Sequence, residues 1–176
     1  FAAAKTNTTG IGNVAIGGNS LKLNTEGCYN ISIGKDTMEA NTEGCYNVAV
    51  GYLALDANTT GLSNTAYGYG SLSANTTASS NVAIGALALD TNTTGCFNVA
   101  VGRQSMDANT EGCFNTAVGS YSMCKNTTGD FNVGIGQDAL FTNTTADDNT
   151  AVGYKAMCLN ETGGNNTAVG FCALAA

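Results

Sequence analysis

The stretch Asn81-Val82-Ala83-Ile84-Gly85 decides the fold. It alternates β-branched and small residues between two residue types that are common in turns. The same five residues recur at 13–17, and Asn-Val-Ala-Val-Gly stands at 47–51 and 98–102. Because this alternation has a period of two, it predicts a short β-strand bracketed by turns and not a helix.

Working outward from this stretch, the sequence repeats every 17 residues with no insertion or deletion. An Asn opens each unit, a second Asn follows six residues later, and a Gly follows four residues after that, from Gly17 to Gly170. We therefore interpret 1–176 as one repeat domain, with a partial repeat at 1–6 and ten 17-residue repeats at 7–176. The first Asn column consists of Asn7, Asn24, Asn41, Asn58, Asn75, Asn92, Asn109, Asn126, Asn143 and Asn160. The second Asn column consists of Asn13, Asn30, Asn47, Asn64, Asn81, Asn98, Asn115, Asn132, Asn149 and Asn166.

A unit of this length predicts the architecture. One unit is too short to bury its own apolar face, whereas stacked units share a core and pair their backbones at about 4.8 Å. Helix-pair repeats, propeller blades and leucine-rich repeats all need longer units. We expect an all-β, parallel β-solenoid of ten coils, roughly 48 Å long at that spacing.

Three kinds of column are expected to hold the coils together. The Asn columns can stack as amide ladders, and Asn also tolerates left-handed backbone at corners. The Gly17 to Gly170 column has no exception, which predicts positive φ or close backbone approach, whereas Ala78 and Ala146 replace the glycine of the Asn-Thr-Thr-Gly corner. The core column never admits a polar residue and consists of Leu21, Met38, Leu55, Leu72, Leu89, Met106, Met123, Leu140, Met157 and Leu174.

Both faces of the strand are restricted in sequence. One carries Val14, Val48 and Val82 with their bulky neighbours, and the other carries alanine and glycine. We expect one face to fill the coil and the other to pack on another copy of the chain. The alternative is a thin monomeric coil whose Val face is partly solvated, which the threonines at positions 65, 116, 150 and 167 of that face favour. Both ends lack a capping repeat, so we expect the chain to associate with itself, and the open ends suit a head-to-tail filament.

Cysteines supply a possible set of cross-links. Cys28 and Cys45 occupy one column on adjacent coils, as do Cys96 and Cys113, so their Cα atoms fall within the disulfide range. The alternative is that they are small buried apolar residues. Several first-column Asn residues also lie in Asn-x-Thr sequons, which are glycan acceptors or corner residues.

The composition argues against nucleic-acid binding, membrane spanning and catalysis. The chain has no His, 6 basic residues and 13 acidic residues, and no run of apolar residues long enough to span a bilayer. Nucleic acid is therefore not an expected partner, and we expect no membrane span. We find no catalytic constellation and no phosphate or dinucleotide motif, so we expect no enzyme, no cofactor and no metal site.

The Asn-Val-Ala-Ile-Gly and Asn-Val-Ala-Val-Gly strings resemble the head repeats of trimeric autotransporter adhesins, and also the repeats of phage tail-fibre proteins. The resemblance covers all ten units, although the adhesin repeats are shorter. It implies a left-handed parallel β-roll, a trimer, and a role in surface attachment or host contact.

We therefore expect a structural fibre or filament segment that is extracellular, at a cell surface or on a virion, where a receptor or glycan is a further candidate partner. An ice-binding solenoid is the alternative, because Thr8, Thr25 and their successors form a column that only Glu161 interrupts.

Overall fold

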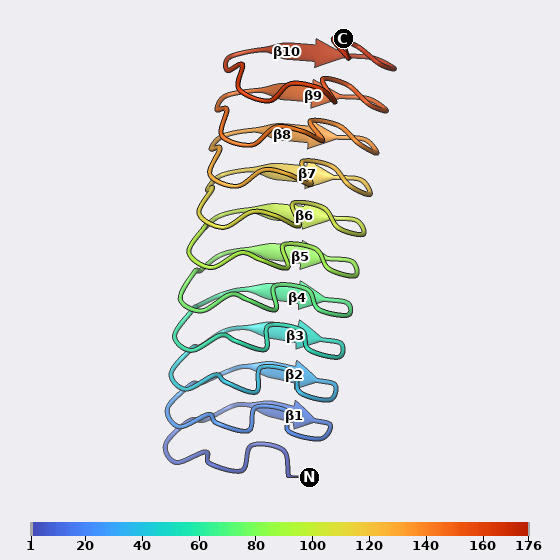
Figure 1. Ribbon diagram of the computed structural model, residues 1–176. Helices are drawn as coiled ribbons and strands as arrows, with labels where there is room; N and C mark the ends of the chain where they lie inside the picture. The colour runs from blue at the N-terminus through green and yellow to red at the C-terminus, as the bar shows by residue number, and fades with distance from the viewer. Residues whose placement is uncertain (1, 176) are drawn as a thin grey trace.

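The computed structural model describes residues 2–175 as a stack of ten coils, with one short strand in each (Figure 1). Each strand has three residues, and the rest of the coil consists of turns. The strands are β1 (Val14–Ile16), β2 (Ile31–Ile33), β3 (Val48–Val50), β4 (Thr65–Tyr67), β5 (Val82–Ile84), β6 (Val99–Val101), β7 (Thr116–Val118), β8 (Val133–Ile135), β9 (Thr150–Val152) and β10 (Thr167–Val169).

The ten strands form one parallel sheet in sequential order. Each residue pairs with its equivalent in the next coil, so that Val14 lies opposite Ile31 and Ala15 opposite Ser32. The predicted all-β parallel solenoid with 17-residue coils is therefore confirmed.

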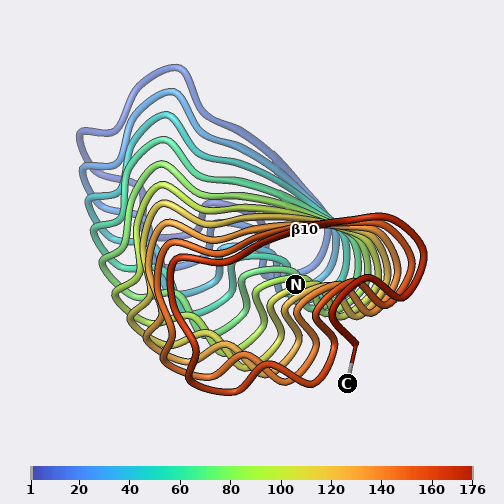
Figure 2. The same cartoon turned by 90° about the horizontal axis from the view of Figure 1, so that it is seen from above.

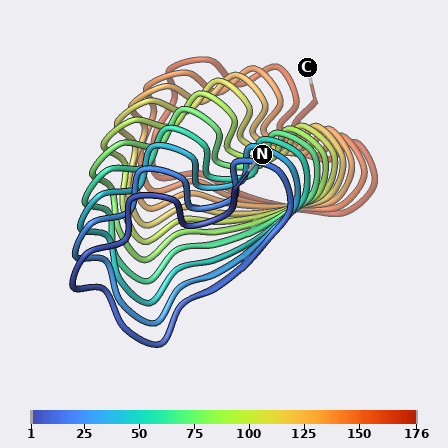
Figure 3. The same ribbon diagram turned by 90° about the horizontal axis from the view of Figure 1, so that it is seen from below.

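The winding of the coil is left-handed, as the adhesin resemblance implies. Seen from the C-terminal end, the chain runs clockwise as it approaches the viewer (Figure 2), and the view from the other end agrees (Figure 3). Both views show each coil turned slightly relative to the one before it, so the corners fan out while the strands cross near one line. The sheet face is therefore twisted along the rod.

Backbone hydrogen bonds join the coils all round their circumference and not only along the sheet. The N–H of Leu21 donates to the carbonyl of Thr37 in the next coil at 3.0 Å, while the N–H of Gly34 donates back to Ile16 at 2.7 Å. Because donors point both ways, each coil is bonded to both neighbours through turns as well as strands.

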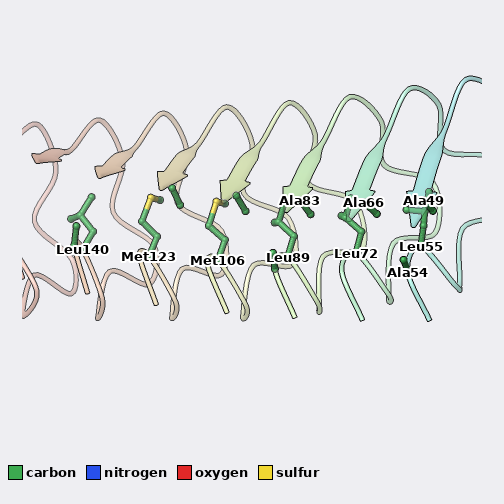
Figure 4. Packing of buried hydrophobic residues seen from close by; sticks show 14 of the residues in the cluster. Ala49, Ala54, Leu55, Ala66, Leu72, Ala83, Leu89, Met106, Met123 and Leu140 are labelled. Atoms are coloured by element: carbon green, nitrogen blue, oxygen red, sulfur yellow. The ribbon is translucent and has the colours of Figure 1, made fainter. Parts of the chain in front are cut away.

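The core is one layer of large side chains facing a wall of small ones (Figure 4). Leu55, Leu72 and Leu89 stack on one side, and the central strand residues Ala49 and Ala66 stand opposite them. Large residues against small ones let a thin coil fill without voids. Every core-column residue from Leu21 to Met157 is buried, whereas Leu174 in the last described coil is exposed.

Left-handed backbone occurs at positions that we did not expect. None of the Asn residues in the two Asn columns has positive φ, so the expectation that they adopt left-handed corners is wrong. The core column does instead, with φ between 46° and 53° from Leu21 to Leu174. This conformation costs roughly 1–2 kcal/mol per non-glycine residue. Burial of a Leu or Met side chain, worth about 1.5–3 kcal/mol, offsets that cost.

The invariant glycine column has both properties that its conservation across coils predicts. Gly85 has a φ of 133°, and a Cβ there would lie 2.6 Å from the carbonyl oxygen of Gly102. The corner glycines do not have positive φ. Where alanine replaces a corner glycine, the corner makes fewer backbone hydrogen bonds to the next coil. Within the described residues the N–H of Thr76 still donates to Thr93 O at 3.5 Å, whereas the N–H groups of Thr77 and Ala78 donate to no backbone carbonyl.

We predict that Gly85→Ala lowers the free energy of unfolding by about 3 kcal/mol or more, because it combines backbone strain with a clash against the next coil. The matched change Gly95→Ala lies in the corner column that tolerates alanine elsewhere. A Cβ there would also approach the next coil, at 2.4 Å from the Gly112 carbonyl oxygen, but the backbone has no positive φ. A small opening of the corner should therefore limit the cost to about 1–2 kcal/mol of weakened backbone bonds. Urea unfolding followed by circular dichroism measures both. Equal losses for the two variants would contradict the special role of the Gly85 column.

Candidate functional site

The outer side of the sheet is the most distinctive surface of the molecule. In each strand the central residue points inward and its two neighbours point outward, as the burial of Val82, Ala83 and Ile84 illustrates. We call these two outward columns the sheet face. The first column is Val14, Ile31, Val48, Thr65, Val82, Val99, Thr116, Val133, Thr150 and Thr167. The second column is Ile16, Ile33, Val50, Tyr67, Ile84, Val101, Val118, Ile135, Val152 and Val169.

The sheet face is largely apolar and is uncovered, and four of its 20 residues are threonines. It contains no charged residue in any of the ten strands. Eight of its side chains count among the exposed large apolar residues, and Ile16, Tyr67 and Val169 are more than half exposed. A strip ten strands tall and three residues wide covers roughly 48 by 10 Å, or about 480 Å². That is as large as the largest apolar patch of a typical monomer.

Exposed aromatic rings stand at both ends of the strands. Before the strands, Phe97, Phe114 and Phe131 stack with ring centroids 5.0 and 5.1 Å apart, and Tyr29 stacks on Tyr46 at 5.5 Å. After the strands, two further pairs stack at 5.3–5.9 Å, and these are Tyr52 with Tyr69 and Tyr154 with Phe171. Stacked rings leave mainly their edges exposed, so they extend the apolar border of the sheet face.

The two Asn columns lie inside the corners and bond in different ways. In the first column Asn109 Nδ2 donates to Asn92 Oδ1 at 2.8 Å, and also to the Gly112 carbonyl at 3.0 Å. In the second column Asn98 Oδ1 accepts the backbone N–H of Asn115 at 3.0 Å, and Asn98 Nδ2 donates to Gly112 O at 2.7 Å. Both columns therefore cross-link coils. The sequon residue Asn58 is fully buried with its amide engaged, so it is closed to glycans in the folded chain.

The threonine column that suggested ice binding is part of the same framework. The carbonyl of Thr42 accepts the N–H groups of Thr25, Glu26 and Gly27 at 3.0–3.1 Å, and the Thr25 hydroxyl donates to it as well, at 3.1 Å. The hydroxyls of this column are thus turned toward backbone carbonyls. No observation favours ice binding over the expected role as a structural fibre segment.

Four of the seven cysteines, Cys28, Cys45, Cys96 and Cys113, share a column whose role the sequence did not reveal. All seven are free thiols, including the four considered for disulfides. Cys45 Sγ accepts the N–H of Cys28 at 3.0 Å, and Cys113 Sγ accepts the N–H of Cys96 at 3.1 Å. In the same column, which we call the thiol column, other acceptors do the same: Leu62 N–H donates to Ser79 Oγ at 3.0 Å. Asp130 likewise accepts the N–H of Cys113 at 2.7 Å. The sequence carried one sign of this acceptor role, because Cys, Ser and Asp, whose side chains can all accept a hydrogen bond, occur at the same position of the repeat.

An acidic column runs along a different side of the rod, through Glu39, Asp56, Asp90 and Asp107. Burial raises the pKa of the Asp56 carboxyl, and the charges of Glu39 and Asp36 raise it further. Burial likewise raises the pKa of Asp107, with a hydrogen bond from Gln104 acting in the opposite direction and the Asp90 charge adding to the rise. Lys22 pairs with Glu39 at 2.6 Å.

The described residues offer little else for chemistry. Within 2–175 no group of three or more His, Cys, Asp or Glu residues is placed to hold a metal ion. No helix in that range is long and apolar enough to cross a bilayer. A surface hollow lined by Asp138, Phe141, Lys155, Cys158 and Leu159 contains no paired acids of the kind that general acid-base catalysis uses.

We predict that Cys45→Ala destabilises the chain by about 1 kcal/mol, because it leaves the Cys28 N–H without its acceptor. Cys45→Ser keeps an acceptor there, as Ser79 does naturally, and should be close to neutral. Thermal unfolding compares the two variants. A serine variant as unstable as the alanine variant would show that the thiol contributes through packing instead.

A second prediction concerns pH. The folded-state pKa of Asp107 is raised, so the fold favours the protonated acid: its contribution is fully present below the unfolded pKa of about 3.9 and is lost as pH rises through the folded pKa. Asp107→Asn, which mimics the protonated acid, should therefore raise the melting temperature at pH 7 and leave it unchanged near pH 3.5. Because Asp107 is only half-buried and solvent screens its charge, the gain should not exceed about 0.5 kcal/mol. Melting curves at the two pH values measure it, and a loss of stability at pH 7 would contradict the sign.

Comparisons with known proteins find no matching family model, no matching curated protein and no matching solved structure. The fold therefore stands on the structure itself: the chain is a parallel β-solenoid repeat protein with coils of about 17 residues.

Proposed function

We propose that the chain is a structural segment of an extracellular fibre, and that its sheet face packs against other copies of the same chain in a homo-oligomer such as a trimer. The observation that carries this proposal is the uncharged, uncovered sheet face that runs through all ten strands. The solvated side of a strand ordinarily carries mainly polar residues, whereas this face carries no charge and its first column is polar only at Thr65, Thr116, Thr150 and Thr167.

Charge distribution supports a copy of the chain as the occupant. The formal net charge is −7, yet every charged residue lies outside the sheet face. Two copies of an acidic chain can therefore approach through this face without placing like charges in contact. A second copy also brings the same strand spacing and the same twist, so its side chains can interdigitate along the whole length.

Size supports the same partner. The strands alone present roughly 480 Å², and the aromatic rings at their ends extend this toward the 800 Å² or so that each partner contributes to a stable interface. A trimer and a role in surface attachment or host contact are what the adhesin and tail-fibre resemblance implies. Stiffness for such a role would come from backbone bonds that link each coil to both neighbours.

The test is the oligomeric state of the chain and of two matched variants. We expect sedimentation equilibrium to give a trimer for the unchanged chain at micromolar concentration. Ile84→Lys/Val101→Lys places two charges on the sheet face, and should weaken association at least about 100-fold because each charge would be buried without a partner. The residues lie on the surface of the single coil, so the melting temperature of the monomer should change little.

The control is Thr77→Lys/Thr94→Lys, which adds the same two charges to the same two coils at exposed sites away from the sheet face. It should associate like the unchanged chain. A monomer in all three cases would refute the proposal, and equal weakening by both double variants would assign the effect to net charge. Growth into long single rods that is insensitive to Ile84→Lys/Val101→Lys would favour head-to-tail stacking.

A further inference from the structure

Two pairs of thiols in the thiol column are held at a fixed spacing. The four sulfurs share one side-chain orientation, since Sγ of Cys28, Cys45, Cys96 and Cys113 lies 3.1–3.4 Å from the carbonyl oxygen two residues before it. In-register coils with the same side-chain orientation place the sulfurs of each pair one coil apart, at about 4.8 Å.

This spacing suits a bridging ion better than a disulfide. A disulfide needs the sulfurs at about 2.05 Å, so both side chains would have to leave their hydrogen bonds to the backbone. A metal–thiolate bond is about 2.3 Å long, as for zinc, and two such bonds in line span about 4.6 Å. Linear coordination by two thiolates is the preference of soft monovalent d10 cations such as Cu(I) and Ag(I). Zinc remains excluded, because it takes four ligands.

The surroundings of the two pairs point to the same chemistry. Glu26, Glu43 and Glu111 each stand two residues before a paired cysteine, and they are the only acidic residues at that position of the repeat. Their carboxylates lie on the exposed side of the same corner, where they favour a cation. The residues that follow the cysteines form stacked ring pairs, Tyr29 with Tyr46 and Phe97 with Phe114, which hold the same two coils together.

We propose that Cys28 with Cys45, and Cys96 with Cys113, form two sites that each bind one soft, two-coordinate d10 cation, of which Cu(I) is the biological example. On binding, each thiol releases its proton to solvent and forms one sulfur–metal bond, so two protons leave for each ion and no electron is transferred. The bridge adds a strong link between two coils along the rod axis. This proposal does not depend on self-association through the sheet face.

Proton competition follows from the site. The thiolate and not the thiol is the ligand, so each bound ion must displace two thiol protons, and acidification should release the ion from both pairs.

The experiment uses Ag(I) nitrate in chloride-free buffer, because silver binds thiolates without redox change. The background is the full chain with Cys124→Ser/Cys158→Ser/Cys172→Ser, which leaves only the four paired thiols. Native mass spectrometry and thiolate-to-metal absorption should both saturate at two ions per chain. Adding Cys45→Ser, which keeps the hydrogen-bond acceptor, should lower the number of tightly bound ions from two to one.

A spacing control separates pair geometry from thiol number. In the same background, Cys45→Ser/Leu62→Cys keeps four thiols in the thiol column but sets the first two about 9.6 Å apart, two coils away from each other. One bridging site should be lost, and circular dichroism reports whether the coil is intact. Saturation at four ions in the background would overturn the proposal, as would two bridging ions in the spacing control. Recovery of the unchanged chain with both pairs oxidised and unable to bind Ag(I) would also overturn it.

Discussion

Each described residue lies about 4.8 Å from its equivalent in the neighbouring coil, and the rest of the structure depends on that constraint. A column is stable only if its residue type tolerates a copy of itself at that distance. An amide does so as both donor and acceptor, as Asn92 and Asn109 do. A stacked carboxylate does so less well: burial raises the pKa of Asp107, and the charge of Asp90 one coil away adds to that rise. The absence of proline from all 176 residues follows as well, because N–H groups donate between coils throughout the turns.

The same constraint repeats backbone strain in every coil. Left-handed φ recurs in three columns, those of Tyr29, Asp36 and Leu21, in addition to the invariant glycines. None of these three columns contains Val, Ile or Thr, although β-branched residues fill the outward columns of the sheet. A β-branched side chain clashes in left-handed backbone but suits a strand. Val, Ile and Thr are therefore absent from the left-handed columns and common in the outward columns of the sheet. This explains why the core column is made of Leu and Met alone.

These columns also show what the sequence could predict and what it could not. A perfect period and the Asn81–Gly85 alternation were sufficient for the coil length, the strand and the parallel sheet, because each depends on pattern alone. Left-handed backbone at Leu21 was assigned to Asn instead, since residue preference suggested Asn and the absence of β-branched residues was not weighed. The acceptor role of Cys45 was missed because it depends on a backbone N–H from the preceding coil, which no side-chain pattern displays.

The sheet face is where folding requirements and sequence diverge. Strand propensity accounts for the β-branched residues there, and it would equally allow the charged or polar residues that solvated strands carry on their outer side. The exclusion of charged residues from the whole face lowers solubility and adds nothing to the interior, which Ala83 and its equivalents already fill. The absence of charged residues is expected where a partner packs on the face. Because the face twists along the rod, a partner that packs on its whole length must have the same twist. A second copy of the same coil has that shape by construction.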